Sequence, residues 1–302
     1  MNTTISRYSI CLLATLTATQ CCAAEPAAPR AKIDGPIRDE DKGVLRWTVT
    51  SQFQHGPNDV EVLLPEKFDL GRKYRVLYVL PVEPGIGGRY GDGLQEIRKI
   101  DAHNRHGLIC VAPAFDAVPW FMDHATDAKM RHESYMLRVV VPMIESRYPT
   151  LGTADGRLLL GFSKSGWGAF TLLLRNPDVF GYAAAWDSPM MLQEPDWRQF
   201  GIDRAAGTVE NFRKYQPAAL FQSQAKHFRD RTQLALLGHK SFGPGGGSAY
   251  RDEHTHTRWA HEEMQSQRIS HAYNNEVKVA HAWHTGWVEP AVNGLMKMVA
   301  AP

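Results

Sequence analysis

The chain has 302 residues, of which 43% are hydrophobic and 22% are charged, a composition that is typical of a globular protein and excludes a disordered one. This length is enough to bury one large core or two small ones. The formal net charge of +2 comes without a concentrated cluster of lysine and arginine, so we expect no nucleic-acid partner.

The first residues have the pattern of an export signal. Arg7 stands in a short polar start, an apolar run follows over residues 8–18, and the small residues Cys22, Ala23 and Ala24 come next. The apolar run is too short to span a bilayer, which takes about 20 residues. We therefore expect a signal peptide at residues 1–24, no membrane span, and a secreted or periplasmic protein. A lipid-modified leader is the alternative.

Loss of this leader would remove three of the four cysteines and leave Cys110 alone. An intramolecular disulfide is then impossible in the mature chain. Cys110 lies within the apolar run at residues 108–112, where a cysteine is expected to act as a small buried hydrophobic residue and not as a nucleophile.

A linker at residues 25–44 is expected to precede a single domain at residues 45–302. The domain opens with two segments, residues 45–50 and 60–64, in which apolar and polar residues alternate as they do in strands. These two segments predict an N-terminal antiparallel hairpin.

From residue 74 on, short apolar runs alternate with longer segments of helical periodicity. The predicted strands are residues 74–80, 107–112, 157–162 and 182–186, and the predicted helices are a segment capped by Asp92 and residues 130–148 and 166–175. Strands that alternate with helices of this length predict an α/β fold with a mostly parallel central sheet and helices on both faces.

The pattern becomes irregular and rich in aromatic residues at about residues 189–229. We expect this segment to be a lid-like insertion that forms a wall of the substrate pocket. Two final strands are predicted at residues 233–237 and 276–280, with a polar helix at about residues 257–267 between them.

The clearest chemical motif follows the strand at residues 157–162, where Gly161 and Ser165-Gly166 flank Ser163 and a helix starts at once. Small flanking residues let a strained strand-to-helix turn close and present a serine hydroxyl above the sheet, so this segment predicts a nucleophile elbow. The alternative is a turn that packs closely or binds phosphate at the helix N-terminus. The residue spacing of a Walker-type loop is absent.

A serine hydroxyl needs a base at neutral pH, and two late histidines qualify. His281 follows the last predicted strand directly, and Trp283 is placed to shield its imidazole from water. His281 is therefore the predicted base. His284 is the alternative, and it has an equally simple explanation as a surface loop histidine.

The acid of the predicted triad has two candidates. The segment after the penultimate strand, residues 238–242, contains no carboxylate. Asp187 directly follows the strand at residues 182–186, whereas Asp252 lies in the loop beyond a glycine-rich run; both keep the chain order serine, acid, histidine. We favour Asp187, because a strand end positions a side chain better than a loop does. Asp187 could instead be a helix N-cap.

A tetrahedral intermediate needs two backbone N–H donors. Lys164, the residue after the serine, is expected to give one. The loop after Leu80 is expected to give the other, and since Pro81 has no N–H, that donor would be Val82 or Glu83.

Aromatic residues near the predicted strand ends are candidates for the walls of the substrate pocket. Trp120 and Phe121 are expected to line an acyl or sugar pocket, together with Trp283, or else to be ordinary core aromatics. A charged group at residues 252–256 has no recognised metal-ligand spacing, so we expect neither a metal nor a cofactor.

With the elbow at Ser163, the late His281-x-Trp283 motif and the strand and loop at residues 78–81, the chain resembles the esterase D-type branch of the α/β-hydrolases, from about Val60 to the C-terminus. The resemblance implies an α/β-hydrolase fold and cleavage of carboxylic esters through an acyl-enzyme. The branch includes carbohydrate esterases, S-formylglutathione hydrolases and mycolyltransferases. Its members often have a histidine-glycine pair where this chain has Pro81-Val82.

Three hypotheses about function follow. The first is an exported serine carboxylesterase that acts on a small-molecule or carbohydrate ester. The second is an acyltransferase or peptidase that uses the same triad. The third is a catalytically silent, carbohydrate-binding relative that keeps the fold.

Overall fold

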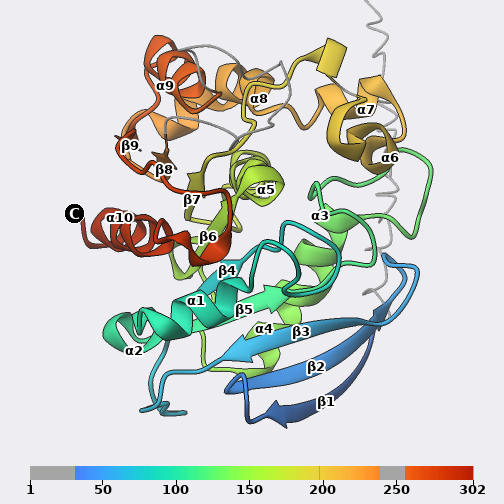
Figure 1. Ribbon diagram of the computed structural model, residues 1–302, viewed down its shortest axis with the longest axis vertical. Helices are drawn as coiled ribbons and strands as arrows, with labels where there is room; N and C mark the ends of the chain where they lie inside the picture. Colours follow the sequence, from blue (N-terminus) through green and yellow to red (C-terminus); the bar gives the residue numbers. More distant parts are fainter. Residues whose placement is uncertain (1–30, 197, 239–255, 302) are drawn as a thin grey trace, which may run out of the picture.

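A twisted sheet runs through the computed structural model, which describes residues 31–196, 198–238 and 256–301 (Figure 1). Within these residues the sheet has nine strands in the order β1-β2-β3-β5-β4-β6-β7-β8-β9. The strands are β1 (Ala31–Asp39), β2 (Val44–Ser51), β3 (Asn58–Leu63), β4 (Arg75–Val79), β5 (Leu108–Pro113), β6 (Arg157–Phe162), β7 (Tyr182–Trp186), β8 (Leu234–Leu237) and β9 (His271–Asn274).

The helices lie between and beside these strands. They are α1 (Gly93–Lys99), α2 (Ala102–His106), α3 (His132–Tyr135), the π-helix η1 (Met136–Val140), α4 (Val141–Arg147), α5 (Ser163–Arg175), α6 (Ile202–Ala206), α7 (Val209–Arg213), α8 (Pro217–Gln224), α9 (His256–Ser266) and α10 (Val288–Ala300). Short 3-10 turns are η2 (Ala154–Gly156), η3 (Glu194–Asp196), η4 (Gln199–Gly201), η5 (Ala225–Phe228) and η7 (Trp283–Thr285).

The predicted N-terminal hairpin is confirmed, because β2 pairs antiparallel with β3, with Leu45 opposite Val62. The expected linker at residues 25–44 is wrong in part, since residues 31–39 form β1 against β2. Most of β1 is exposed and its register shifts between Asp34 and Ile37. An edge strand of this kind has no buried face, so apolar residues do not alternate along it.

The parallel part of the sheet comprises β5, β4, β6, β7, β8 and β9, each paired parallel with its neighbour. Alternate side chains enter two separate cores: Val76 and Tyr78 of β4 face one, and Leu77 and Val79 face the other. The first core is covered by α3, α4, α5 and α8, and the second by α1 and α10 (Figure 1). The prediction of a mostly parallel sheet with helices on both faces is therefore confirmed.

The last predicted strand is wrong, because β9 consists of residues 271–274 and residues 276–280 have no regular structure. The adjacent strand β8 has four residues, and each of them pairs with a residue of β9. Residues 276–280 therefore continue beyond the sheet, and Val279 is 40% exposed there. The apolar alternation of this segment does not reflect a buried face.

The irregular segment at residues 189–229 folds into short helices from η3 to η5 that lie beside α5 (Figure 1). Part of it forms a third core with Trp120, Met122 and Trp167. The expected leader at residues 1–24 lies outside the described residues. Within the described ranges, no helix is both long and apolar enough to cross a bilayer.

Candidate functional site

Two neighbouring strands end at the same level of the sheet. Phe162, the last residue of β6, pairs with Trp186, the last residue of β7. Ser163 and Asp187 follow them, and both have left-handed backbones with φ of 51° and 44°. Residues other than glycine adopt such angles when the surrounding structure holds them, often at functional sites. The register therefore brings the predicted nucleophile and the favoured acid to adjacent strand ends.

The turn at Ser163 is held closed by a second serine. The buried hydroxyl of Ser165 accepts a hydrogen bond from the Phe162 N–H (3.1 Å) and donates one to the Phe162 carbonyl (2.9 Å). A side chain at Gly161 would collide with the backbone, since its Cβ would lie 2.3 Å from the carbonyl oxygen of Ser165. The elbow thus requires glycine at one flank and uses the hydroxyl of Ser165 at the other.

Ser188 connects the two strand ends. Its buried hydroxyl donates a 2.8 Å hydrogen bond to the carbonyl of Ser163. At Gly166, an added Cβ would lie 2.9 Å from the Ser188 Cβ. The first turn of α5 therefore packs directly against the backbone after β7, and the elbow and the segment of Asp187 form one unit.

His281 pairs with Asp187. Nδ1 of His281 lies 2.8 Å from Oδ2 of Asp187, whose side chain is 2% exposed. The imidazole packs edge-on against Phe162, with 5.0 Å between the ring centroids, and lies 5.9 Å from the Trp186 ring. His281 therefore sits above the two residues that precede Ser163 and Asp187.

The alternative base is His284, and the alternative acid is Asp252. His284 is exposed in η7 and lies beside Gly91. Asp252 lies outside the described residues. Among the candidates that the structure describes, His281 and Asp187 are the pair joined by a hydrogen bond. The sequence predicted that His281 follows a strand, but the segment before it is irregular.

The loop after β4 contains Val82 and Glu83, the two candidates for the second oxyanion donor, and this role stays a prediction. Neither Val82 nor Glu83 donates its backbone N–H to any residue that the structure describes. Lys164 lies in the first turn of α5, where backbone N–H groups have no partner within the helix. Its side chain reaches across to this loop, with Nζ 2.9 Å from Oε1 of Glu83. Sequence reasoning missed this ion pair, because 81 residues separate its partners.

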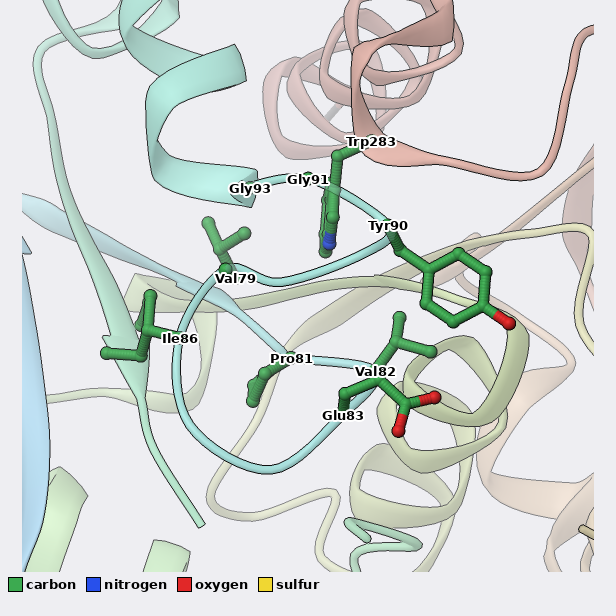
Figure 2. A pocket seen from close by; sticks show the side chains of 11 residues that line it. Val79, Pro81, Val82, Glu83, Ile86, Tyr90, Gly91, Gly93 and Trp283 are labelled. Atoms are coloured by element: carbon green, nitrogen blue, oxygen red, sulfur yellow. The ribbon is translucent and has the colours of Figure 1, made fainter.

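Figure 2 shows a small cavity behind this loop, lined by Val79, Pro81, Tyr90 and Trp283 among others. Its volume of about 10 Å³ has room for a single water molecule at most. Trp283 lines this small cavity and packs on Phe162 with 5.1 Å between the ring centroids. A role for Trp283 in the substrate pocket stays a prediction.

Trp120 and Phe121 are wholly buried, which agrees with the alternative that they are ordinary core aromatics. Trp120 packs edge-on against Trp167 of α5 and donates a 3.2 Å hydrogen bond to the Phe200 carbonyl. Phe121 fills the space next to Gly168, where an added Cβ would lie 2.0 Å from its ring. Both residues therefore pack against the first turns of α5, at Trp167 and Gly168.

An open cleft of about 320 Å³ lies farther along the same loop. It is lined by Pro84, Ala117, Val118, Met130, Gly201, Arg204 and Ala205. Gly201, Arg204 and Ala205 come from the irregular segment that the sequence predicted to be a pocket wall. The cleft begins one residue after Glu83, the partner of Lys164.

Cys110 is wholly buried, and burial raises the pKa of its thiol, as expected of an unreactive core residue. Of the charged group at residues 252–256, only His256 is described, and its Nδ1 accepts a 3.1 Å hydrogen bond from the Met191 N–H. In the described part of the chain, no three side chains of the metal-binding types gather in one place.

Solved structures of known proteins superimpose on most of this chain. An S-formylglutathione hydrolase from Agrobacterium tumefaciens superimposes with a TM-score of 0.63 at 16% identity, covering 85% of this chain and 95% of that one. A ferulic acid esterase from the fungus Anaeromyces mucronatus gives 0.53 at 15%, covering 90% and 91%. Likeness at these identities concerns the fold.

Sequence comparison reaches further. Esterase MT1326 of Mycobacterium tuberculosis (strain CDC 1551 / Oshkosh) is 27% identical over 153 residues, 47% of this chain and 31% of that protein. The chain thus spans about a third of the length of the curated relatives that it matches. The family described as "Putative esterase" matches residues 51–297. Since this match covers most of its length, the chain belongs to that family.

Proposed function

We propose that the protein is a serine esterase that cleaves carboxylic esters through an acyl-enzyme on Ser163. The observation that carries this proposal is the 2.8 Å hydrogen bond between His281 and buried Asp187, next to a serine on a left-handed strand-to-helix turn. A histidine oriented by a carboxylate is the general base that a serine nucleophile needs. The family match and the fold of the solved esterases support the same reaction class.

In this mechanism Nε2 of His281 removes the proton from Oγ of Ser163 as Oγ attacks the ester carbonyl carbon. Asp187 keeps the other ring nitrogen protonated and stabilises the imidazolium. The N–H of Lys164 and that of Val82 or Glu83 stabilise the negative oxygen. His281 then gives its proton to the departing alcohol, and a water molecule repeats the sequence to release the acid and restore Ser163.

The cleft that starts at Pro84 is our candidate for the binding site of one side of the ester. Its volume of about 320 Å³ falls within the range of small-molecule pockets. The similarity to ferulic acid esterases suggests acyl groups attached to carbohydrate as the substrate class. Replacement of half-buried Val118 by Trp would narrow this cleft while leaving the triad residues unchanged.

The leader pattern at the N-terminus supports export to the periplasm or the medium. Expression of the full chain followed by N-terminal sequencing tests this proposal. We expect the exported protein to begin close to Glu25. A chain that keeps its first 24 residues in the cytoplasm would contradict it.

Substitution Ser163→Ala tests the proposed chemistry, because it removes the nucleophile from a site that already supports a small side chain. We expect hydrolysis of short p-nitrophenyl esters to fall by about 10³-fold or more, with an unchanged melting temperature. A fluorophosphonate probe should label the wild type at Ser163 and leave the variant unlabelled. Full turnover by Ser163→Ala would exclude the acyl-enzyme, and unlabelled wild type would favour a silent relative.

A further inference from the structure

The ion pair between Lys164 and Glu83 joins the two segments that are expected to hold the oxyanion. We propose that it is a clasp, defined by these two side chains, that fixes the loop after β4 against the nucleophile elbow. Both residues are then positioning residues for acyl transfer. This inference rests on the proposed function, because it concerns the same two N–H donors.

The contact is close and partly shielded from water. Nζ of Lys164 lies 2.9 Å from Oε1 of Glu83, with the lysine side chain 15% exposed and the glutamate side chain 26% exposed. An ion pair of this kind is less screened by water and salt than a fully exposed one. Lys164 and Glu83 are also residues whose backbone N–H groups are candidate donors, so the side-chain contact limits how far the two donors can move apart.

The loop has few other restraints at this point. Leu80 still donates its backbone N–H to β6, at Leu160, and Gly85 donates to Phe115. In between, residues 81–84 donate no backbone hydrogen bond to any part of the chain that the structure describes. Of these residues, Pro81 and Pro84 have no N–H, and their rings fix φ. Burial of Pro81 and Val82 holds the start of the stretch, and the clasp holds Glu83. The glycines that follow, Gly85 and Gly87, have positive φ and add no stiffness.

Charge gives the clasp a second role. A free carboxylate on Glu83 would repel the substrate oxygen that becomes negative in the transition state, because the carboxylate lies on the same short loop as the candidate N–H donor for that oxygen. The ammonium group of Lys164 neutralises it. Loss of Lys164 alone therefore leaves an unpaired negative charge beside the donors, whereas loss of both groups leaves none.

A double-mutant cycle tests the clasp. We expect Glu83→Gln to lower kcat by about tenfold, since donors that shift by fractions of an ångström lose much of their effect. Lys164→Met should lower kcat further, and KM should change by less than about twofold in both variants, because the donors act on the transition state. The double variant should be no slower than Lys164→Met. The reversed pair, Lys164→Glu with Glu83→Lys, should recover part of kcat.

The Arg231–Asp155 pair serves as the matched control. Its 2.8 Å contact lies at the opposite end of β6, so Asp155→Asn should leave kcat unchanged. The inference would be overturned if the single variants of the clasp keep wild-type kcat, or if the loss of kcat in the double variant is the product of the losses in the two single variants. In either case, the proposed function still stands as long as turnover by the wild type depends on Ser163. Turnover that persists in Ser163→Ala removes both.

Discussion

Asp187 combines deep burial with an ionisable side chain. Its carboxylate is 2% exposed, and Oδ2 pairs with His281 while Oδ1 has no hydrogen-bond partner among the described residues. A buried carboxylate is costly unless it has a partner, and its backbone φ of 44° adds strain. A residue held under these conditions is suited to orient one particular histidine tautomer.

Substitution Asp187→Asn tests this role at the scale of one residue. The amide keeps the shape of the side chain but favours the wrong tautomer of His281, so kcat should fall by about 10³- to 10⁴-fold. The melting temperature should change little in comparison. Turnover of p-nitrophenyl acetate and thermal unfolding measure the two effects separately.

Asp178→Asn is the control for this substitution, because Asp178 is exposed on the loop between α5 and β7. It should keep wild-type kcat. Replacement of a triad aspartate by asparagine leaves far less than a tenth of the wild-type activity. If Asp187→Asn retains more than about a tenth, another carboxylate orients His281, and Asp252 becomes the next residue to replace.

The residues of the site differ in how far the sequence could predict them. Ser163 was predictable because its motif is local, with small flanks between a strand and a helix. Asp187 and Asp252 were both open, since chain order alone does not say which carboxylate meets His281. The pairing of Phe162 with Trp186 brings Asp187 next to the elbow, and such register is a long-range property that local patterns do not encode.

At the scale of elements, His281 depends on a segment without regular structure. Side chains hold this segment by its backbone carbonyls: Trp186 Nε1 donates to Val277 (3.2 Å), and Trp287 Nε1 donates to Ala282 (2.9 Å). The hydroxyl of Thr285 lies 2.7 Å from the Ala280 carbonyl and 2.9 Å from that of Ala282. These bonds replace the strand that the sequence predicted before His281.

Substitution Thr285→Val should therefore impair catalysis without touching the triad. Valine matches threonine in shape but lacks the hydroxyl, so the carbonyls on both sides of His281 lose one of their two donors: Ala280 keeps the Ala282 N–H, and Ala282 keeps Trp287 Nε1. We expect kcat to fall several-fold, with a loss in unfolding free energy of about 1 kcal/mol. Steady-state kinetics and urea unfolding provide the two measurements.

Thr126→Val offers the comparison, since Thr126 is exposed in another loop. Equal kcat for Thr285→Val and Thr126→Val would mean that the hydroxyl bonds do not position His281. A fall in stability alone would point to the same conclusion.

The strands also differ in how well the sequence predicted them. Buried strands such as β6 and β7 were predicted with the right bounds, because both of their faces contact a core. The outermost strands β1 and β9 were missed. Each has a neighbour on one side and exposed or half-buried side chains, so neither continuous apolar runs nor strict alternation marks them.

At the scale of the whole molecule, two apolar cores enclose the sheet, and one of them contains a histidine. His132 starts α3, is wholly buried, and packs against Phe115 with 4.9 Å between ring centroids. Both of its ring nitrogens have no hydrogen-bond partner in the described part of the chain. Burial lowers the pKa of His132 to about 4, although the charge of Asp123 acts in the opposite direction.

This histidine should make the fold sensitive to acid. In the unfolded chain its pKa is close to 6.5, so the unfolded state binds the proton between about pH 6.5 and 4 while the folded state does not. The contribution of neutral His132 to the free energy of unfolding is fully present above pH 6.5 and decreases as the pH falls toward 4. The loss from this group should reach about 2 kcal/mol at pH 5.

Urea unfolding at pH 7 and pH 5 measures this loss, and His132→Leu isolates the contribution of the buried ring. Leucine has no group to protonate and leaves no unpaired nitrogen in the core, so the variant should lose about 2 kcal/mol less than the wild type between the two pH values. His227→Gln, at an exposed position, should behave like the wild type. An equal loss in wild type and His132→Leu would mean that acid acts on the fold elsewhere, because protonation of a wholly buried imidazole must favour the unfolded chain.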